Sequence, residues 1–336
     1  MTPALRIGIL GTGKIAERAL LAPAKDVSEI RVEAVGSRTN ERARAYAAAN
    51  GIERAQSYEE LIADPAIDIV YITLPPSMHA DWSIRALEAG KHVLCEKPMA
   101  ANEVEARQVA QAVHQSDLVY MEAFHYPYHP FAKRVRDLLD THVIGEIRDV
   151  EASFQIPGKF IARDNIRLSF LLGGGALMDA GCYPLRALRS LLGEVVNVRE
   201  AHAQTTPEAS QVDLAMRATL EFANGREGRL HTSFLASDKP DVRVFIRGET
   251  GALDITSLYV PQWGGALRLV WGRRVYVEQA DPTPSYLYQL RELVRCVRDG
   301  APVLTNVDDG ISNMAAIDAI YRKAGLELRG GAAQAR

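Results

Sequence analysis

Residues 6–20 read RIGILGTGKIAERAL, and this stretch decides the fold of the first half of the chain. The short apolar run Ile7–Leu10 is typical of a buried strand, and an amphipathic helix pattern begins after the glycines. Between them, Gly11 permits a tight turn, Gly13 lets the backbone approach phosphate oxygens, and Ala16 keeps helix and strand close. A strand that turns through glycines into a helix directs backbone N–H groups at a pyrophosphate. The stretch therefore predicts a dinucleotide site, rather than only a tight strand-to-helix turn.

The composition fits a globular protein of two domains. The chain has 336 residues, 47% of them hydrophobic and 24% charged, which exceeds one ordinary domain. A net charge of −3 argues against nucleic acids or membrane surfaces as partners. Cys95, Cys182 and Cys296 have no paired spacing, which fits a reducing compartment. Because there is no apolar run long enough to span a bilayer and no room for a signal peptide, we expect a cytoplasmic protein.

The second strand, Ile30–Val35, indicates which nicotinamide cofactor binds. In a nucleotide domain of this kind, an acidic residue at the end of this strand accepts from the 2′-OH of NAD, whereas an arginine accommodates the 2′-phosphate of NADP. Residues 36–40 read GSRTN, so Ser37 and Arg38 stand there, with Arg42 one helical turn further on. A serine can donate a hydrogen bond and an arginine can pair with phosphate in bidentate fashion. We predict NADP, with NAD as the alternative; the plain interpretation of Arg38 is a solvated first-turn residue.

Two later strand ends carry further candidate contacts. The buried strand Ile67–Thr73 runs into a rigid loop, LPPSMH at residues 74–79, at the edge where open α/β sheets bind ligands. His79 opens the next helix, and such a histidine is more often a capping or packing residue than a ligand. The strand at residues 92–95 runs into Glu96-Lys97-Pro98, where Lys97 can reach the nicotinamide and Glu96 can orient it or bond the ribose. The plain alternative is a strand end with an ordinary salt bridge. The predicted cofactor contacts are Gly11, Thr12, Gly13, Lys14, Ile15, Ser37, Arg38, Arg42, Thr73, Leu74, Pro75, His79, Glu96 and Lys97.

Alternation of short buried strands with helices predicts a doubly wound parallel sheet, a Rossmann domain, over residues 1–124. Local signals mark its helix ends: Asn50-Gly51 as a C-cap and Ser57 with Glu60 as a capping box. Residues 125–336 are expected to form an α+β domain for substrate binding and oligomerisation. The last helix, residues 308–323, is expected to pack back on the first domain.

The second domain should contain a large, mostly antiparallel open sheet. Six alternating segments without intervening helices occupy residues 195–279, and Asn224-Gly225 between two of them is a hairpin signal. One face of the sheet should lie on helices. The other face, if apolar, would join subunits into a homodimer or homotetramer.

The substrate cleft is expected to include EAFHYPYH, residues 122–129. His125 and His129 have a metal-like spacing, but Pro127 interrupts the helix that the spacing needs, and we predict no metal. The glycines at 173–175 suggest a mobile loop close to a ligand. The helix that follows carries Asp179 and Tyr183 on one face, with a kink or restart at Pro184. The predicted substrate contacts are Lys97, Glu122, Phe124, Arg167, Asp179 and Tyr183.

Four motifs resemble the glucose–fructose oxidoreductase, inositol dehydrogenase and MocA family of oxidoreductases. They are the GxGxxA at residue 11, ITLPPSMHADW at 72–82, KHVLCEKPMA at 91–100 and GGGALMDAGCYPLRAL at 173–188. The resemblance implies that Lys97 lies beside the nicotinamide and that Asp179 is the acidic residue of the last motif. Four residues on, the inositol dehydrogenase branch has a histidine, whereas Tyr183 resembles the branch of dihydrodiol dehydrogenase and NADP-dependent xylose dehydrogenase. This branch implies chemistry on an aldose or a vicinal diol rather than a cyclitol.

The residues then suggest how a proton is handled. Lys97, Asp179 and Tyr183 are the predicted catalytic residues. A free tyrosine has a pKa of about 10, and a neighbouring ammonium favours its phenolate, so Tyr183 would be the general base in the oxidative direction. Alternatively, Lys97 carries the proton and Tyr183 only donates a hydrogen bond. Two other functions stay open: a catalytically silent NADP-binding regulator, and an enzyme that keeps its cofactor bound and couples two sugar half-reactions.

Overall fold

A computed structural model describes residues 3–162 and 165–330, which form two compact units. The first unit contains the described chain up to His125 together with Pro284–Ile311, and the second contains Tyr126–Thr283 and the described chain from Ser312. The chain therefore returns to the first unit after completing the large sheet of the second. Helix α8, Val307–Lys323, contributes residues to both units.

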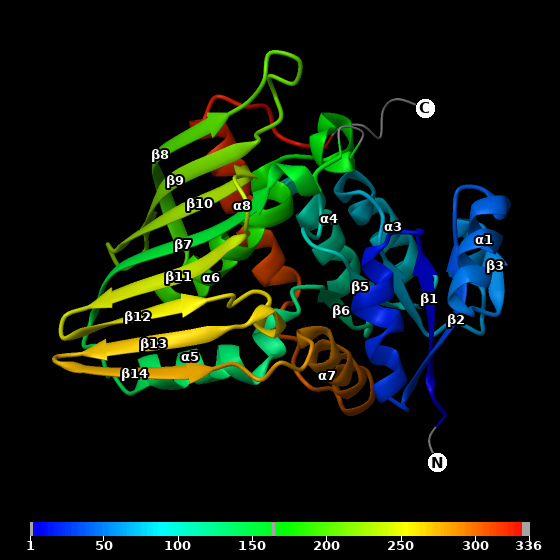
Figure 1. The fold of residues 1–336 in the computed structure, drawn as a ribbon. Helices are drawn as coiled ribbons and strands as arrows, with labels where there is room; N and C mark the ends of the chain where they lie inside the picture. Colours follow the sequence, from blue (N-terminus) through cyan, green and yellow to red (C-terminus); the bar gives the residue numbers. More distant parts are fainter. Residues whose placement is uncertain (1–2, 163–164, 331–336) are drawn as a thin grey trace. The chain divides into compact units, whose positions relative to one another are not determined.

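The first unit is built on a parallel sheet, which has six strands among the described residues (Figure 1). Its order is β3-β2-β1-β4-β5-β6, and β1 pairs with both β2 and β4, so the winding direction reverses at that point. The loops after β1 and β4 consequently lie at the switch point where such sheets bind ligands. The strands are β1 Leu5–Leu10, β2 Ile30–Gly36, β3 Arg54–Gln56, β4 Ile69–Ile72, β5 His92–Cys95 and β6 Tyr120–Glu122.

The helices of the first unit begin and end where the local sequence signals predict. Gly51 adopts a left-handed conformation with φ of 66° after the helix it caps, and Ser57 and Glu60 form the complete capping box. After β1 the expected helix begins with α-helical Ile15 and Ala16, continues as the π-helical turn η1 and is followed by a 3₁₀ turn, η2. The elements are η1 Glu17–Leu21, η2 Pro23–Asp26, α1 Asn40–Asn50, α2 Tyr58–Ala63, α3 Pro76–Glu88, α4 Glu103–His114 and α7 Ser285–Asp299.

The second unit contains the predicted open sheet, with eight strands among the described residues in the order β14-β13-β12-β11-β7-β10-β9-β8. Only the β7–β10 pair is parallel there, and Gly225 has the positive φ, 76°, of the predicted hairpin turn. The alternating pattern did not reveal β12. The strands are β7 Ile147–Pro157, β8 Val195–Gln204, β9 Ala215–Phe222, β10 Glu227–Ala236, β11 Asp241–Gly248, β12 Gly251–Thr256, β13 Ala266–Trp271 and β14 Arg274–Gln279.

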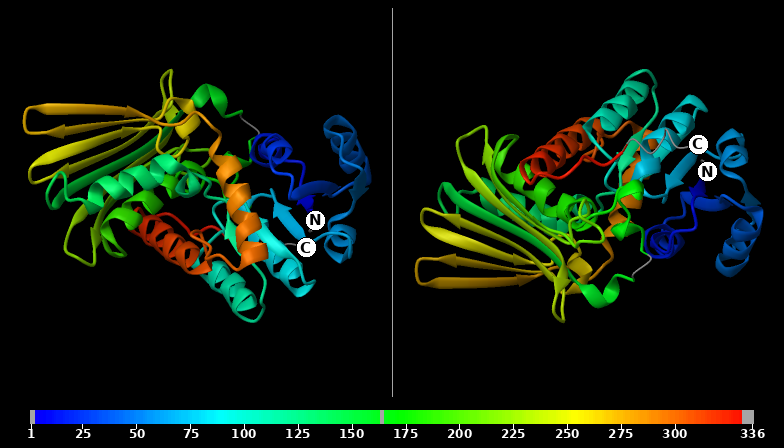
Figure 2. Two further views of the ribbon diagram at one scale, coloured as in Figure 1. Left: turned by 90° about the horizontal axis from the view of Figure 1, so that it is seen from below. Right: turned by 90° about the horizontal axis from the view of Figure 1, so that it is seen from above.

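Helices cover one face of this large sheet. Figure 2 shows α5, α6 and α8 on the same side of the strands. Buried apolar side chains such as Val150, Leu230 and Val244 alternate along their strands with more exposed ones. The helical elements of this unit, besides α8, are η3 Tyr126–Tyr128, α5 Pro130–Asp140, η4 Gly158–Phe160, η5 Ile166–Leu168, η6 Phe170–Leu172, η7 Leu177–Gly181, α6 Cys182–Leu192 and η8 Pro261–Trp263.

The opposite face of the large sheet carries charged pairs over its central strands. Arg229 on β10 pairs with Glu151 and Asp149 on β7, and Arg243 on β11 pairs with Asp254 on β12. Arg229, Glu151 and Arg243 are among the residues that line a hollow of about 650 Å³ on this face. On β14, Val275 and Val277 are exposed, and their partners on β13 alternate with buried Leu267 and Leu269, so this face also carries apolar side chains near the β14 edge.

Candidate active site

The glycine turn after β1 packs directly on the end of β4. Gly11 has a φ of 104°, and a Cβ there would lie 2.7 Å from Thr73 Oγ1. A Cβ on Gly13 would lie 3.1 Å from the Thr73 carbonyl oxygen, while Thr73 Oγ1 donates to the Leu10 carbonyl at 3.0 Å. A side chain at Gly11 would collide with the neighbouring strand end, and one at Gly13 would be tightly packed against it. The backbone therefore runs through a tight cradle at the switch point, as a pyrophosphate site requires.

The residues predicted to read the cofactor's ribose lie next to this turn. Arg38 and Arg42 are exposed, and Arg42 Nη2 lies 3.3 Å from Thr12 Oγ1 in the glycine turn. Ser37 is buried, and its N–H donates to the Gln56 carbonyl at 3.1 Å. The structure thus brings Thr12 and Arg42 together, although they are thirty positions apart in the chain.

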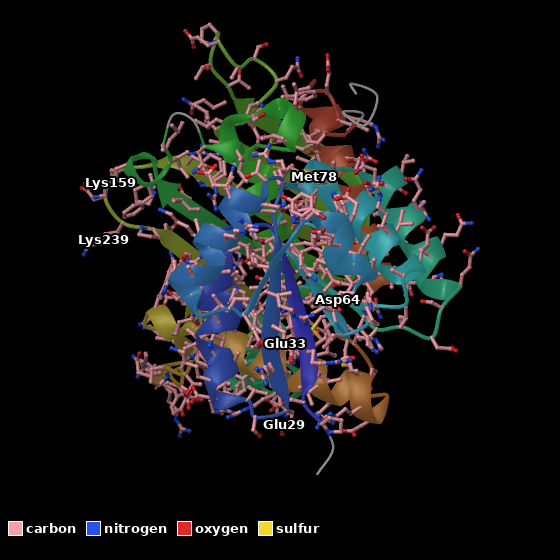
Figure 3. The ribbon with its side chains drawn as sticks, turned by 90° about the vertical axis from the view of Figure 1, so that its right-hand side faces the viewer. Glu29, Glu33, Asp64, Met78, Lys159 and Lys239 are labelled. Carbon is pink, nitrogen blue, oxygen red and sulfur yellow. The ribbon has the colours of Figure 1, made fainter. Side chains whose placement is uncertain are left out.

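Glu33, the acidic residue of β2, is paired with an arginine of β3. Glu33, which is labelled in Figure 3, accepts from Arg54 at 2.9 Å, and Arg54 also pairs with the labelled Asp64. Glu33 lies on the strand itself, three residues before Gly36, where β2 ends. The β2 carboxylate is therefore neutralised by an arginine, and residues 36–40 add no other acid. This charge pattern suits a 2′-phosphate better than a bare ribose hydroxyl.

His79 connects the two loops that carry the motifs of this unit. Its ring is buried, with Nε2 at 2.7 Å from the Leu74 carbonyl and Nδ1 at 2.7 Å from the Pro98 carbonyl. Two carbonyl partners favour the charged ring, but burial outweighs them and lowers the pKa of His79 to about 4. A neutral imidazole carries one N–H, so at neutral pH it donates to only one of these two carbonyls, whereas two donated bonds would need the charged ring. Cofactor contact by His79 stays a prediction.

The Lys97 turn is held from a second side by Glu122. Glu122 Oε1 accepts the Met99 N–H at 2.8 Å, and the Glu122 carbonyl accepts from Thr305 Oγ1 at 2.6 Å. Lys97 itself is half-buried, and Phe124 is buried. Glu122 therefore braces the turn, and the predicted substrate contacts of Glu122 and Phe124 stay predictions.

Glu96, which precedes this lysine, accepts from the hydroxyl of Tyr71 at 2.5 Å. Burial raises the pKa of Glu96, and the charge of Lys97 opposes that shift. The structure thus gives Glu96 a fixed partner on β4, and its predicted contact with the nicotinamide ribose stays a prediction.

The two histidines with metal-like spacing have structural partners. His125 Nδ1 lies 2.7 Å from Ser285 Oγ, and its ring lies 4.0 Å from that of Tyr286. His129 Nδ1 accepts the Phe131 N–H at 3.0 Å as the cap of α5. Within residues 3–162 and 165–330 we find no group of three or more His, Cys, Asp and Glu side chains that could hold a metal ion.

In the second unit the structure brings Arg167 and Asp179 together. Arg167 Nε lies 2.6 Å from Asp179 Oδ2, and both side chains are partly exposed. Asp179 lies in the π-helical turn η7, and α6 begins directly after it, with Pro184 in its first turn. The helix therefore restarts before Pro184, as expected, and π-turns of this kind are frequent at functional sites. An arginine and a carboxylate in contact can both address neighbouring hydroxyl groups of one ligand.

Tyr183 lies in a cluster of aromatic rings. Its centroid lies 5.5 Å from that of Phe154, 5.8 Å from that of Tyr259 and 6.3 Å from that of Tyr126. The side chain is 7% exposed. An apolar setting of this kind restricts the ring to one orientation.

The glycine run at 173–175 is a buried turn, which corrects the expected mobile loop. The Gly174 N–H donates to Ser169 and the Gly175 N–H to Arg167, both through backbone carbonyls. Next to Gly175 lie three buried residues that the sequence reasoning missed: Asp213, Tyr321 and Arg329. The one available signal was Asp213, a single acid inside the apolar run VDLAM.

Comparison with known proteins matches both halves of the chain. Residues 5–124 match the model of an oxidoreductase family with an NAD-binding Rossmann fold, and residues 132–254 match the GFO/IDH/MocA C-terminal domain. A D-xylose 1-dehydrogenase (NADP(+)) from Haloferax volcanii is 35% identical over 95% of this chain and 97% of its own. This chain belongs to the GFO/IDH/MocA family of oxidoreductases.

Two further family members are informative. A trans-1,2-dihydrobenzene-1,2-diol dehydrogenase from Xenopus laevis is 32% identical over 70% of both chains. The crystal structure of a 3-ketoreductase from Actinomadura kijaniata, solved with NADP and TDP-benzene, covers 97% of this chain and 98% of its own, with a TM-score of 0.87 and 29% identity.

Family membership confirms several of the sequence-based predictions. It confirms the Rossmann domain, the second sheet domain, and an enzyme of the NAD(P)-dependent oxidoreductase type. The relatives include the xylose and dihydrodiol dehydrogenases expected for a chain with Tyr183 in the last motif. The relatives favour the enzymatic interpretation over a silent regulator. In the described part of the chain, no helix is both long and apolar enough to cross a membrane.

Proposed function

We propose that this protein is an NADP-preferring dehydrogenase or reductase that acts on an aldose or a small vicinal diol. The proposal rests on two features found in the same chain: a glycine turn suited to a dinucleotide, and side chains suited to proton transfer. The Gly11–Gly13 cradle and the exposed Arg38 and Arg42 suit NADP, and Lys97, Asp179 and Tyr183 suit alcohol oxidation. The relatives that use NADP on a sugar support the same assignment.

The residues of the first unit fit the cofactor. The missing Cβ atoms of Gly11 and Gly13 let the turn pack closely on Thr73, and in a turn of this kind the backbone N–H groups would hold the phosphate oxygens. Arg38 and Arg42 would hold the 2′-phosphate by charge-assisted hydrogen bonds, with Ser37 next to them. When bound, the nicotinamide supplies the hydride chemistry.

The protein's own task is then to move one proton and to orient the substrate. In the oxidative direction Tyr183 accepts the proton of the substrate hydroxyl, and the Lys97 ammonium stabilises the resulting charge. Asp179 accepts hydrogen bonds from a neighbouring hydroxyl while Arg167 holds the carboxylate in place. A close alternative gives the proton to Lys97 and leaves Tyr183 as a hydrogen-bond donor.

The outer face of the large sheet is our proposed subunit interface, in a homodimer or homotetramer. Its hollow carries both signs of charge, including Arg217, Arg229, Glu151 and Asp241. A surface of mixed charge can be complementary to a second copy of itself across a two-fold axis. A cytoplasmic location is consistent with the three buried free thiols of Cys95, Cys182 and Cys296.

A substrate panel tests the function. Purified protein is mixed with NADP or NAD and with aldoses, vicinal diols and cyclitols, and nicotinamide absorbance is followed in both directions. We expect turnover with NADP and an aldose or diol. No turnover with any alcohol or carbonyl would contradict the proposal. Turnover only between two sugars, with cofactor retained by the protein through gel filtration, would replace it by a sugar–sugar oxidoreductase.

A further inference from the structure

Three buried polar side chains of the second unit form one cluster behind the glycine run. Asp213 and Tyr321 are fully buried, and Arg329 is 1% exposed. Arg329 Nη2 lies 2.9 Å from Asp213 Oδ1, and Tyr321 Oη donates to the same oxygen at 2.8 Å. The three residues come from positions far apart in the chain, and Arg329 lies at the C-terminal end of the described residues.

The cluster holds the backbone of the glycine run at several points. Asp213 Oδ2 accepts the Leu177 N–H at 2.7 Å, and the Asp213 carbonyl accepts the Ala176 N–H at 2.8 Å. Arg329 Nε donates to the Gly174 carbonyl at 2.8 Å. The backbone on both sides of Gly175 is therefore fixed, by Asp213, which lies just before β9, and by Arg329 in the C-terminal segment.

Gly175 connects this cluster to the Arg167–Asp179 pair. Its N–H donates to the Arg167 carbonyl at 2.9 Å, and its carbonyl accepts the Asp179 N–H at 3.0 Å. With a φ of 135° and no side chain, Gly175 lies against the cluster: a Cβ would overlap the Asp213 carboxylate and lie 2.8 Å from Tyr321 Oη. One residue, Gly175, thus bonds to the backbone of both Arg167 and Asp179.

The Arg329 side chain is also fixed by aromatic rings. Its guanidinium lies 4.0 Å from the centroid of Tyr321 and 5.1 Å from that of Phe170, which belongs to the segment between Arg167 and the glycines. A planar guanidinium can stack on rings and still donate along its edge, which an ammonium cannot do. The position therefore depends on arginine and not only on a positive charge.

We propose that Asp213, Tyr321 and Arg329 are positioning residues, which act through Gly175 to hold Arg167 and Asp179 in the orientation that the substrate needs. The inference rests on the proposed function, since it assigns the pair to the substrate. It goes beyond that function because it places a requirement for turnover in the C-terminal segment, which carries none of the family motifs.

The desolvation of these buried charged groups offsets much of their mutual attraction, so the cluster is not explained by a gain in folding stability. A buried ion pair contributes little compared with apolar residues of the same size, although removal of one partner leaves an uncompensated charge. Burial raises the pKa of Asp213 to about 6, and Arg329 opposes that shift. Variants that keep the charge of residue 329 are therefore the informative ones, because they avoid an unpaired carboxylate.

The test compares the same substitution, arginine to lysine, at two positions. Arg329→Lys keeps the charge but loses the simultaneous contacts with Gly174 and Asp213. Arg322→Lys is the matched control, since Arg322 is exposed in the last turn of α8. Hydrogen exchange is measured on peptides that cover residues 166–181, and kcat and KM are measured on the same preparations. We expect Arg329→Lys to speed exchange of the Ala176, Leu177 and Asp179 amides at least tenfold and to lower kcat/KM at least fivefold, with Arg322→Lys unchanged in both.

A second comparison separates positioning from a general loss of stability. In an Asp179→Asn background, Arg329→Lys should change kcat/KM less than twofold, because the residue through which it acts is already impaired. If Arg329→Lys does not fold, the same measurements are made on Tyr321→Phe, which removes one hydroxyl, and the same results are expected. Unchanged exchange at residues 176–179, or additive losses with Asp179→Asn, would overturn the proposal. Hydrogen exchange can be measured on inactive protein. If the wild-type protein shows no activity, the proposed function fails, and the exchange data still test whether Arg329 fixes residues 176–179.

Discussion

Arg167 and Asp179 are joined twice: by a 2.6 Å hydrogen bond from Arg167 Nε to Asp179 Oδ2, and through Gly175, whose N–H and carbonyl bond to the two backbones. Their side chains are 38% and 18% exposed, so the pair is reachable from solvent. A carboxylate held in this way offers fixed acceptor positions to a ligand with several hydroxyl groups.

The first prediction concerns this pair. Arg167→Met should lower kcat/KM for the sugar or diol about tenfold or more, because Asp179 loses the contact that orients it. Asp179→Asn should lower it to a similar extent, and the double variant should be little worse than either single one. Steady-state kinetics on the three variants checks this. Arg148→Met, an exposed arginine on β7, is the control. Losses that multiply in the double variant would show that the two residues act independently.

The second prediction concerns cofactor choice. Arg38→Ala should lower kcat/KM with NADP about tenfold to a hundredfold, since a charge-assisted hydrogen bond is worth about 1.5–3 kcal/mol. The value with NAD should hardly change, because NAD has no 2′-phosphate. Arg44→Ala, another exposed arginine on α1, is the control and should leave both values unchanged. An equal loss with both cofactors would assign Arg38 to something other than the 2′-phosphate.

The third prediction concerns pH and stability. Burial lowers the pKa of His79 from 6.5 to about 4, so below pH 6.5 the unfolded ring takes up a proton that the folded ring refuses. Stability should fall as the pH drops through this window, with His79 contributing about 2 kcal/mol between pH 7 and pH 5. Urea unfolding should show a smaller decrease for His79→Gln than for the wild type. His114→Gln, at an exposed histidine of α4, should keep the wild-type decrease, and the idea fails if all three proteins lose stability equally.

The fourth prediction concerns assembly. Thr219 on β9 lines the hollow on the outer face of the large sheet, and its strand partner on β8 is Glu200. Thr219→Glu places like charges opposite each other and should convert an oligomer into monomers, as seen by light scattering after gel filtration. Ser190→Glu, at an exposed site on α6, should leave the oligomer intact. A wild-type protein that is monomeric at micromolar concentration would exclude the interface.

Local chemistry explains what the sequence could predict. The strand at Ile7–Leu10, the caps at Gly51 and Ser57 and the hairpin at Gly225 depend on neighbours in the chain, and the structure has all of them. The pattern missed β3, which has only three residues, and β12, which begins with Gly251 and Ala252 and so shows little alternation of apolar and polar side chains.

Contacts between distant parts of the chain explain what the sequence could not predict. The bridge from His79 to Pro98, the brace of Glu122 on Met99 and the pairing of Asp213 with Arg329 join residues 19, 23 and 116 positions apart. Nothing in the local sequence distinguishes Arg329 from a solvated arginine near a chain end. The glycine run was expected to be mobile because glycines permit motion, but here they permit close packing against a buried carboxylate.

The central claim is that Lys97 and Tyr183 handle the proton of one substrate. The most direct measurement is the pH dependence of kcat for Lys97→Met and Tyr183→Phe, with Lys133→Met and Tyr276→Phe as controls at exposed sites. The account predicts that both active-site variants fold, lose more than about tenfold in kcat and change the alkaline limb of the profile, while both controls match the wild type. If neither active-site variant slows turnover tenfold, the proposed site is wrong.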